Sequence, residues 1–252
     1  MFFRQFDEFF RTVYTDPMQP GKEILFPDWD LASIVHSLSP ASDDQLSQIT
    51  SLLHEDKIDA ALNWLQIETS RYPWVMLAAA FVSIRKNLPE EAKRWLRAVT
   101  LIATDTVVQL WAWHNLRLLG VEPPANLATK VLGIVIEVPN QGAEDILASY
   151  ADGSARFLSY TGAMIVWDDY HEQITPLIHE GIKLARPVGK MVVEHAADIV
   201  KDGIVRLTIL TPGGMYCWEG EPEDGTEIAR LFARQAVLLK ILVQTVINNR
   251  AD

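Results

Sequence analysis

A cluster of four neighbouring residues has the side chains that metal binding and acid–base catalysis require. It contains Asp168, Asp169, His171 and Glu172. Carboxylate oxygens and an imidazole nitrogen can hold a divalent cation or transfer protons, so the cluster would suit a metal-dependent hydrolase. The same residues stand at the start of an expected helix, where acids cap free N–H groups and offset the helix dipole. We favour the capping role and keep the hydrolase as the alternative hypothesis.

The other reactive residue types do not form a catalytic pattern. The sequence has no His-Glu-x-x-His pair, no phosphate-binding glycine pattern and no Gly-x-Ser-x-Gly elbow. The single cysteine, Cys217, excludes an intramolecular disulfide and a cysteine-based zinc site. Acidic neighbours, Glu219 and Glu221, disfavour a reactive thiolate, so we interpret Cys217 as structural. We expect no catalytic residue, no metal and no cofactor.

Charge and composition exclude several classes of partner. The 252-residue chain has 22 Lys and Arg against 33 Asp and Glu, a net charge of -11, and the acidic excess is spread over both halves. Such a chain lacks the basic surface that nucleic acids and anionic membranes require. The apolar run Ala236–Ile247 is interrupted by Lys240 and Gln244 and is too short to span a bilayer. With no signal-peptide pattern at the N-terminus, we expect a soluble cytoplasmic protein.

Helical periodicity dominates the first half of the chain. Residues 1–40 predict an amphipathic helix over 2–14, followed by a Pro-rich connection, and residues 41–124 predict a helical-hairpin module. The pattern Ala61-x-x-Trp64-Leu65 recurs 31 residues later. This repeat gives residues 58–119 a weak resemblance to tetratricopeptide repeats, with generic helical hairpins as the alternative. The expected helices are Ile58–Ser70, Pro73–Lys86, Pro89–Ile102 and Asp105–Leu119.

The pattern changes to strands after residue 124. Residues 125–252 predict an α+β domain with an antiparallel β-meander sheet and two covering helices, in the order β-β-β-β-α-β-β-α. The expected helices are Tyr170–Arg186 and Glu223–Asn249. The fold class is therefore α+β, with an N-terminal all-α, repeat-like module.

Two turn dipeptides, Asp152-Gly153 and Thr161-Gly162, set the expected strand register. Taken as two-residue hairpin loops, they place Leu147 opposite Leu158 and Leu158 opposite Ile165. One face then carries Leu147, Leu158, Ile165 and Trp167 beside Arg156, and the other face is apolar as well. Arg156 and Trp167 would form a cross-strand pair, with ligand binding by cation–π contact as the alternative. A sheet that is apolar on both faces needs two covers, and a partner or the chain's own helices would supply the second.

The segment YADGSARFLSYTGAMIVW, with VLGIVIEV before it and LTILTPGGMYCWEG after it, resembles a group of uncharacterised bacterial proteins. The resemblance covers residues 131–220 and implies no activity. The order of elements is also similar to the type III secretion chaperone-like fold, whose members mostly bind other proteins.

The patterns together predict a non-catalytic adaptor or regulatory subunit of a multi-component bacterial system. Its partner would be another protein, in a hetero-complex or in a homodimer formed through the apolar sheet face or the C-terminal helix. Large apolar and aromatic side chains, together with one arginine, are the expected contact residues. They are Leu147, Leu158, Ile165, Trp167, Arg156, Phe2, Phe6, Trp111 and Trp113.

Overall fold

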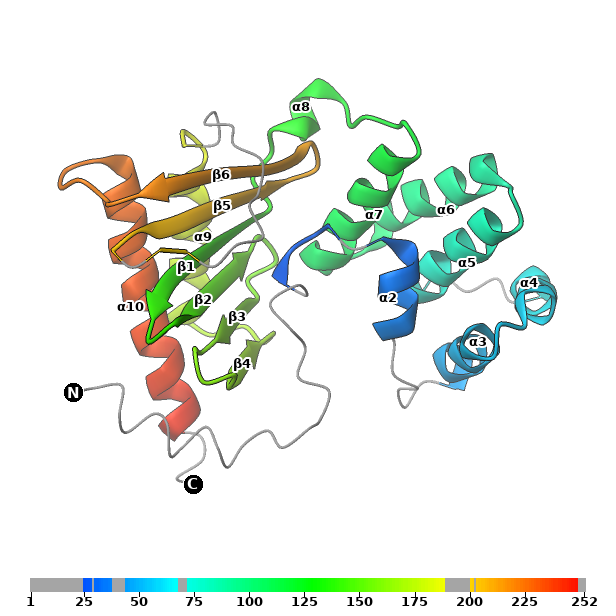
Figure 1. The fold of residues 1–252 in the computed structure, drawn as a ribbon, viewed down its shortest axis with the longest axis horizontal. Helices are drawn as coiled ribbons and strands as arrows, with labels where there is room; N and C mark the ends of the chain where they lie inside the picture. Colours follow the sequence, from blue (N-terminus) through cyan, green and yellow to red (C-terminus); the bar gives the residue numbers. More distant parts are fainter. Residues whose placement is uncertain are drawn as a thin grey trace. The chain divides into compact units, whose positions relative to one another are not determined.

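A computed structural model describes residues 25–28, 30–37, 44–67, 72–188, 200–201 and 203–248. The helix expected over residues 2–14, with Phe2 and Phe6, lies outside the described residues. The chain divides into two compact units, one over Phe26–Ala128 and one from Thr129 onward that also includes Leu25. The first unit is helical and the second contains the sheet (Figure 1).

The helical unit confirms the four helices expected between residues 58 and 119, each to within a few residues. Central α5 is buried from Val75 through Ser83, as expected of a helix that is apolar on all sides, and it contacts α2, α3, α4 and α6. The elements of the unit are α2 (Leu31–Ser37), α3 (Asp44–His54), α4 (Ile58–Ile67), α5 (Pro73–Arg85), α6 (Pro89–Ile102), α7 (Thr106–Leu118) and α8 (Ala125–Ala128).

Three helices of this unit end in the same way. The chain turns into the left-handed region at Asp56 after α3, at Asn87 after α5 and at Gly120 after α7, with φ of 54°, 58° and 75°. In each case the residue after the left-handed one donates its backbone N–H to a carbonyl of the last helical turn, as Val121 does to Leu116 at 2.9 Å. These equivalent ends lie 31 and 33 residues apart, close to the repeat length expected from the sequence. The tetratricopeptide relationship itself stays a prediction.

The second unit confirms the predicted α+β order. Six strands form one antiparallel sheet in the order β4-β3-β2-β1-β5-β6, so the chain crosses from edge strand β4 through α9 to the far side of β1. The elements are β1 (Gly133–Asn140), β2 (Ala143–Tyr150), β3 (Ala155–Leu158), β4 (Met164–Trp167), α9 (Ile174–Ala185), β5 (Val205–Thr211), β6 (Gly214–Gly220) and α10 (Glu227–Asn248).

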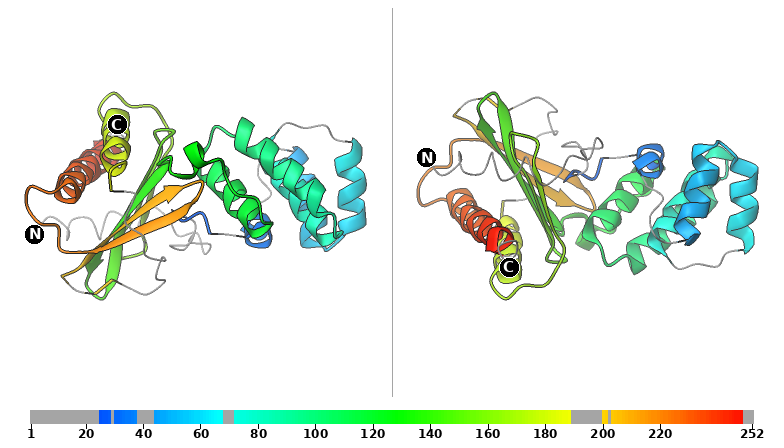
Figure 2. Two further views of the ribbon diagram at one scale, coloured as in Figure 1. Left: turned by 90° about the horizontal axis from the view of Figure 1, so that it is seen from above. Right: turned by 90° about the horizontal axis from the view of Figure 1, so that it is seen from below.

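Helices α9 and α10 pack against each other and cover one face of the sheet (Figure 2). Their buried side chains Ile174, Ile178 and Leu238 meet Leu147 and Phe157 of the sheet. At 22 residues, α10 is long and apolar enough to cross a membrane by length and composition alone, which corrects the prediction that this region is too short. Its buried apolar residues are part of the sheet unit's core.

The predicted register of the meander was wrong by one residue. Leu147 pairs with Phe157, and Phe157 pairs with Ile165. Each connection has three residues rather than two, closed by a glycine in the left-handed region: Gly153 at φ 93° and Gly162 at φ 86°. A three-residue hairpin loop also has glycine in its last position, so an Asp-Gly or Thr-Gly pair is compatible with either loop length. The Asp-Gly and Thr-Gly pairs therefore marked the turns but not their length.

A slip of one residue moves side chains to the other face. Leu147, Ile165 and Trp167 face the helices together with Phe157, while Leu158 and Arg156 face the opposite side. The opposite face is buried too, because Val135, Ala148 and Leu210 have no exposed surface. Both faces are therefore buried at their centres. Leu25 accepts a hydrogen bond from the Tyr150 hydroxyl on the opposite face, at 3.0 Å.

Candidate functional site

Strand β4 is one of the two edges of the sheet, and we call residues 164–169 the β4 edge. In an antiparallel pair, residues alternate between those whose backbone groups point at the partner strand and those whose groups point away. Ser159 donates to the Ala163 carbonyl at 2.8 Å, which fixes this alternation along β3 and β4. The N–H and C=O groups of Met164 and Val166 consequently point away from β3. In the described part of the chain, no hydrogen bond is recorded to those groups.

Two residues of β4, Met164 and Ile165, are buried, and exposure begins at Val166. Ile165 is 4% exposed beneath the helices, whereas Val166 is 46% exposed. Tyr170, just beyond the strand, is 79% exposed. The β4 edge thus combines outward backbone groups with one exposed apolar side chain, Val166, and an exposed tyrosine follows the strand.

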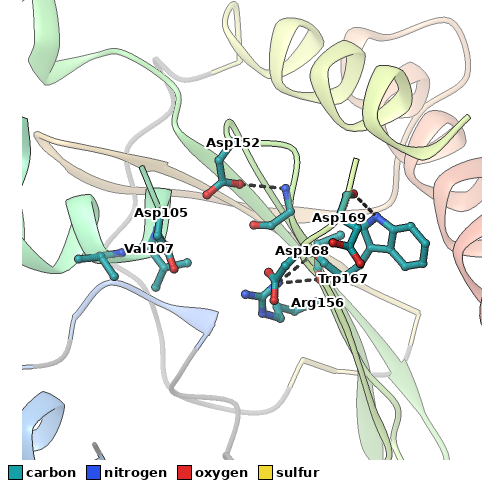
Figure 3. Close-up of polar contacts among 10 residues, drawn as sticks. Asp105, Val107, Asp152, Arg156, Trp167, Asp168 and Asp169 are labelled. Atoms are coloured by element: carbon teal, nitrogen blue, oxygen red, sulfur yellow. Dashed lines mark hydrogen bonds and ion pairs between the residues drawn. The ribbon is translucent and has the colours of Figure 1, made fainter. Parts of the chain in front are cut away.

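An ion pair fixes the end of the β4 edge (Figure 3). Arg156 Nη1 lies 2.7 Å from Asp168 Oδ1, and the same guanidinium donates to the carbonyls of Ala155 and Trp167 at 3.0 and 3.3 Å. Arg156 lies opposite Val166 in the ladder, not opposite Trp167 as the predicted register required. Because the carboxylate and the two carbonyls hold the guanidinium, its position is explained without a ligand.

The acidic cluster does not cap the helix that follows it. Helix α9 begins at Ile174, has no acid in its first turn and has no side-chain cap, so the capping interpretation was wrong. The segment is instead held by Trp167, whose Nε1 donates to the Asp169 carbonyl at 2.8 Å and whose ring meets that of His171 edge-on at 5.7 Å. Among the described residues, no three His, Cys, Asp or Glu side chains gather as metal ligands would.

Several of the expected contact residues that the structure describes are buried. Leu147 and Ile165 are buried beneath α9 and α10, with Trp167 packed against them. In the helical unit Trp111 is 7% exposed, donates to the Phe26 carbonyl at 3.3 Å and meets Trp74 edge-on at 5.8 Å. Trp113, on the same helix, is half-buried. Val166 at the β4 edge and Tyr170 just beyond it are exposed, and neither was among the predicted residues.

A buried charge cluster on the opposite face was missed by the sequence interpretation. The Arg206 guanidinium lies 3.2 Å from Glu137 and 2.6 Å from Glu219, and the side chains of Arg206 and Glu137 are 2% and 0% exposed. Burial alone would lower the pKa of Arg206, but the hydrogen bond to Glu219 and the charge of Glu137 raise it, so the guanidinium stays charged. One acid and one base, each inside an otherwise apolar strand, were the signal available in the sequence.

Cys217 lies beside this cluster. It is 3% exposed, and its sulfur is 3.9 Å from the Thr208 hydroxyl. Burial raises the pKa of its thiol, which keeps it protonated near neutral pH. A buried, protonated thiol has the properties of the structural cysteine that the sequence suggested.

A small cavity lies between the sheet and α10. Its volume is about 130 Å³, and its lining is apolar except for Asp145 and Gln235. The Gln235 amide oxygen accepts from the Ser149 hydroxyl at 2.9 Å, and its nitrogen lies over Gly181 of α9. The amide is thus directed at the α9–α10 contact, so the cavity offers a ligand little polar anchoring. Its lining is Ile136, Val138, Asp145, Leu147, Phe157, Phe232, Gln235, Ala236 and Leu239.

The chain was compared with known proteins in three ways. No model of a known protein family matches the sequence. Neither the curated proteins nor the solved structures contain a significant match. The resemblance to uncharacterised bacterial proteins therefore stays a prediction, and the function has to be argued from the geometry alone.

Proposed function

We propose that this protein is a non-catalytic adaptor or regulatory subunit that binds another protein. The observation that carries the proposal is the β4 edge, where the Met164 and Val166 backbone groups point away from β3 and no hydrogen bond from the described residues reaches them. An open strand edge is a template on which another chain can pair.

Side-chain chemistry at this edge supports binding rather than catalysis. Asp168 is held by Arg156, and Trp167 organises the following turn through the Asp169 carbonyl and the His171 ring. The ion pair engages the Asp168 carboxylate, one of the groups that a hydrolase would need as a ligand or base. These contacts also fix the end of the strand, and a fixed edge loses less conformational entropy when a partner binds.

Quantitative co-purification tests the proposal. The tagged full chain would be crosslinked in its source organism and the captured proteins quantified, alongside Val166→Pro and Val166→Thr variants. Proline removes the outward N–H and is tolerated at a sheet edge, whereas threonine keeps both the N–H and the β-branched shape. We expect one protein to be enriched equally by the wild type and Val166→Thr, and at least about fivefold less by Val166→Pro. No enrichment over the tag alone would contradict the proposal.

A further inference from the structure

We infer that the β4 edge binds an extended segment of a partner protein in which apolar residues alternate along the strand and Lys or Arg residues follow at one end. The inference rests on the proposed function and specifies the chemistry of the segment that is bound. Three properties of the β4 edge carry it: its backbone groups, its exposed side chains and its charge.

The backbone groups define the geometry of the occupant. Met164 and Val166 each present an N–H and a C=O outward, with the spacing of an ordinary ladder. Only a chain in extended conformation places its own donors and acceptors at that spacing. A helix or a folded surface would leave these groups unpaired, so the occupant is a strand.

The exposed side chains define which residues alternate. Val166 is 46% exposed, next to Ile165 at 4%. A strand added outside β4 would place every second side chain beside Val166, where an apolar or β-branched residue packs best. Tyr170, at 79% exposure, provides a second accessible large side chain four residues further along the chain.

The charge at the end of the strand selects a basic flank and disfavours a second copy. Asp168 is neutralised by Arg156, but Asp169 and Glu172 are exposed carboxylates. Arg156 is the only Lys or Arg in the sequence between Val131 and Ile182. A second copy of β4 would bring the same carboxylates and no spare cation, whereas a segment with Lys or Arg beyond its apolar residues would complement the charge.

Selection from a random peptide library displayed on phage, with the full chain as bait, tests the inference. We expect the selected peptides to alternate apolar residues and to carry Lys or Arg at one end. In fluorescence anisotropy, Val166→Pro should weaken the best peptide about 10-fold or more, and Val166→Thr should change its affinity by less than about twofold. Reversing the charges with Asp169→Lys and Glu172→Lys together should weaken it about fivefold at low salt, with the loss shrinking as salt increases.

Amide hydrogen exchange of the wild-type chain tests the same inference without a variant. Peptide binding should slow exchange in the segment that contains Met164 and Val166. Protection elsewhere, selected peptides without a basic flank, or no selected peptide at all would overturn the inference. So would self-association that Val166→Pro abolishes, because the occupant would then be a second copy. A partner that co-purifies with Val166→Pro as well as with the wild type would leave the protein-binding function standing and remove only the role of the β4 edge.

Discussion

The face of the sheet beneath α9 and α10 and the opposite face are both buried, but by different kinds of side chain. Beneath the helices the core is apolar, and the main polar contact is the hydrogen bond from Ser149 to Gln235. The opposite face contains the Arg206–Glu137 ion pair and the Tyr150 hydroxyl, all almost fully buried. One face is thus held mainly by shape and hydrophobicity, and the other also by specific polar partners.

The difference shows how the two buried faces of one sheet can be stabilised by different interactions. Apolar packing tolerates small rearrangements as long as the volume is filled. A buried ion pair tolerates none, because either partner alone is an uncompensated charge in a medium of low polarity. The charged face therefore fixes how β1, β5 and β6 align, and we expect substitutions on the two faces to have unequal effects.

The largest effect is expected from Arg206→Ala. Removing the guanidinium leaves Glu137, with 0% side-chain exposure, without its positive partner, and should cost about 3–5 kcal/mol of unfolding free energy. Urea denaturation of the purified chain measures it. The double variant Arg206→Met with Glu137→Leu removes both charges and should recover most of that loss. A single variant as stable as the double would show that the ion pair is not what distinguishes this face.

Gly181→Ala tests the helix-covered face and should have an intermediate effect. A methyl group on Gly181 would lie 2.2 Å from the Gln235 amide nitrogen and 3.3 Å from Ile134, so α10 must move or the amide must turn. We expect a loss of about 1–3 kcal/mol despite the better helix propensity of alanine. Combining the change with Gln235→Ala should cost less than the sum of the two single changes. Additive losses would mean that the amide and the glycine do not meet.

The smallest effect is expected from Tyr150→Phe. The tyrosine hydroxyl donates to the Leu25 carbonyl at 3.0 Å and is fully buried, so its removal should cost about 1–1.5 kcal/mol. Tyr216→Phe, on the helix-covered face, is the matched control and should change the thermal midpoint little, because Tyr216 is only partly buried. Equal shifts for the two variants would remove the polar distinction between the faces.

The sequence predicted the elements of this fold better than their registration. The apolar periodicity placed α4 to α7 within a few residues, and the two turn dipeptides separated β2, β3 and β4. The length of each turn was not encoded in the dipeptide, because glycine ends both two-residue and three-residue loops. The one-residue error assigned Leu158 to the wrong face and directed the search for a contact surface to side chains that are buried.

The polar features of the site could be predicted only in part. Asp168 and Arg156 were both identified, but their pairing depended on the register. Glu137 and Arg206 are 69 residues apart and meet only because β5 pairs with β1 rather than with β4. Strand order is decided by how the whole unit packs, and local patterns contain no information about it.

The pairing of β1 with β5 also has a consequence for how the chain assembles. β1 to β4 are joined by short turns, whereas joining Gly133 to Leu210 closes a loop of more than seventy residues that includes α9. Closing a long loop costs more chain entropy than forming a hairpin, so the meander can form early and the β5–β6 hairpin docks late. Arg206 and Glu137 come from the two sides of that final junction, so their ion pair exists only once the sheet is complete.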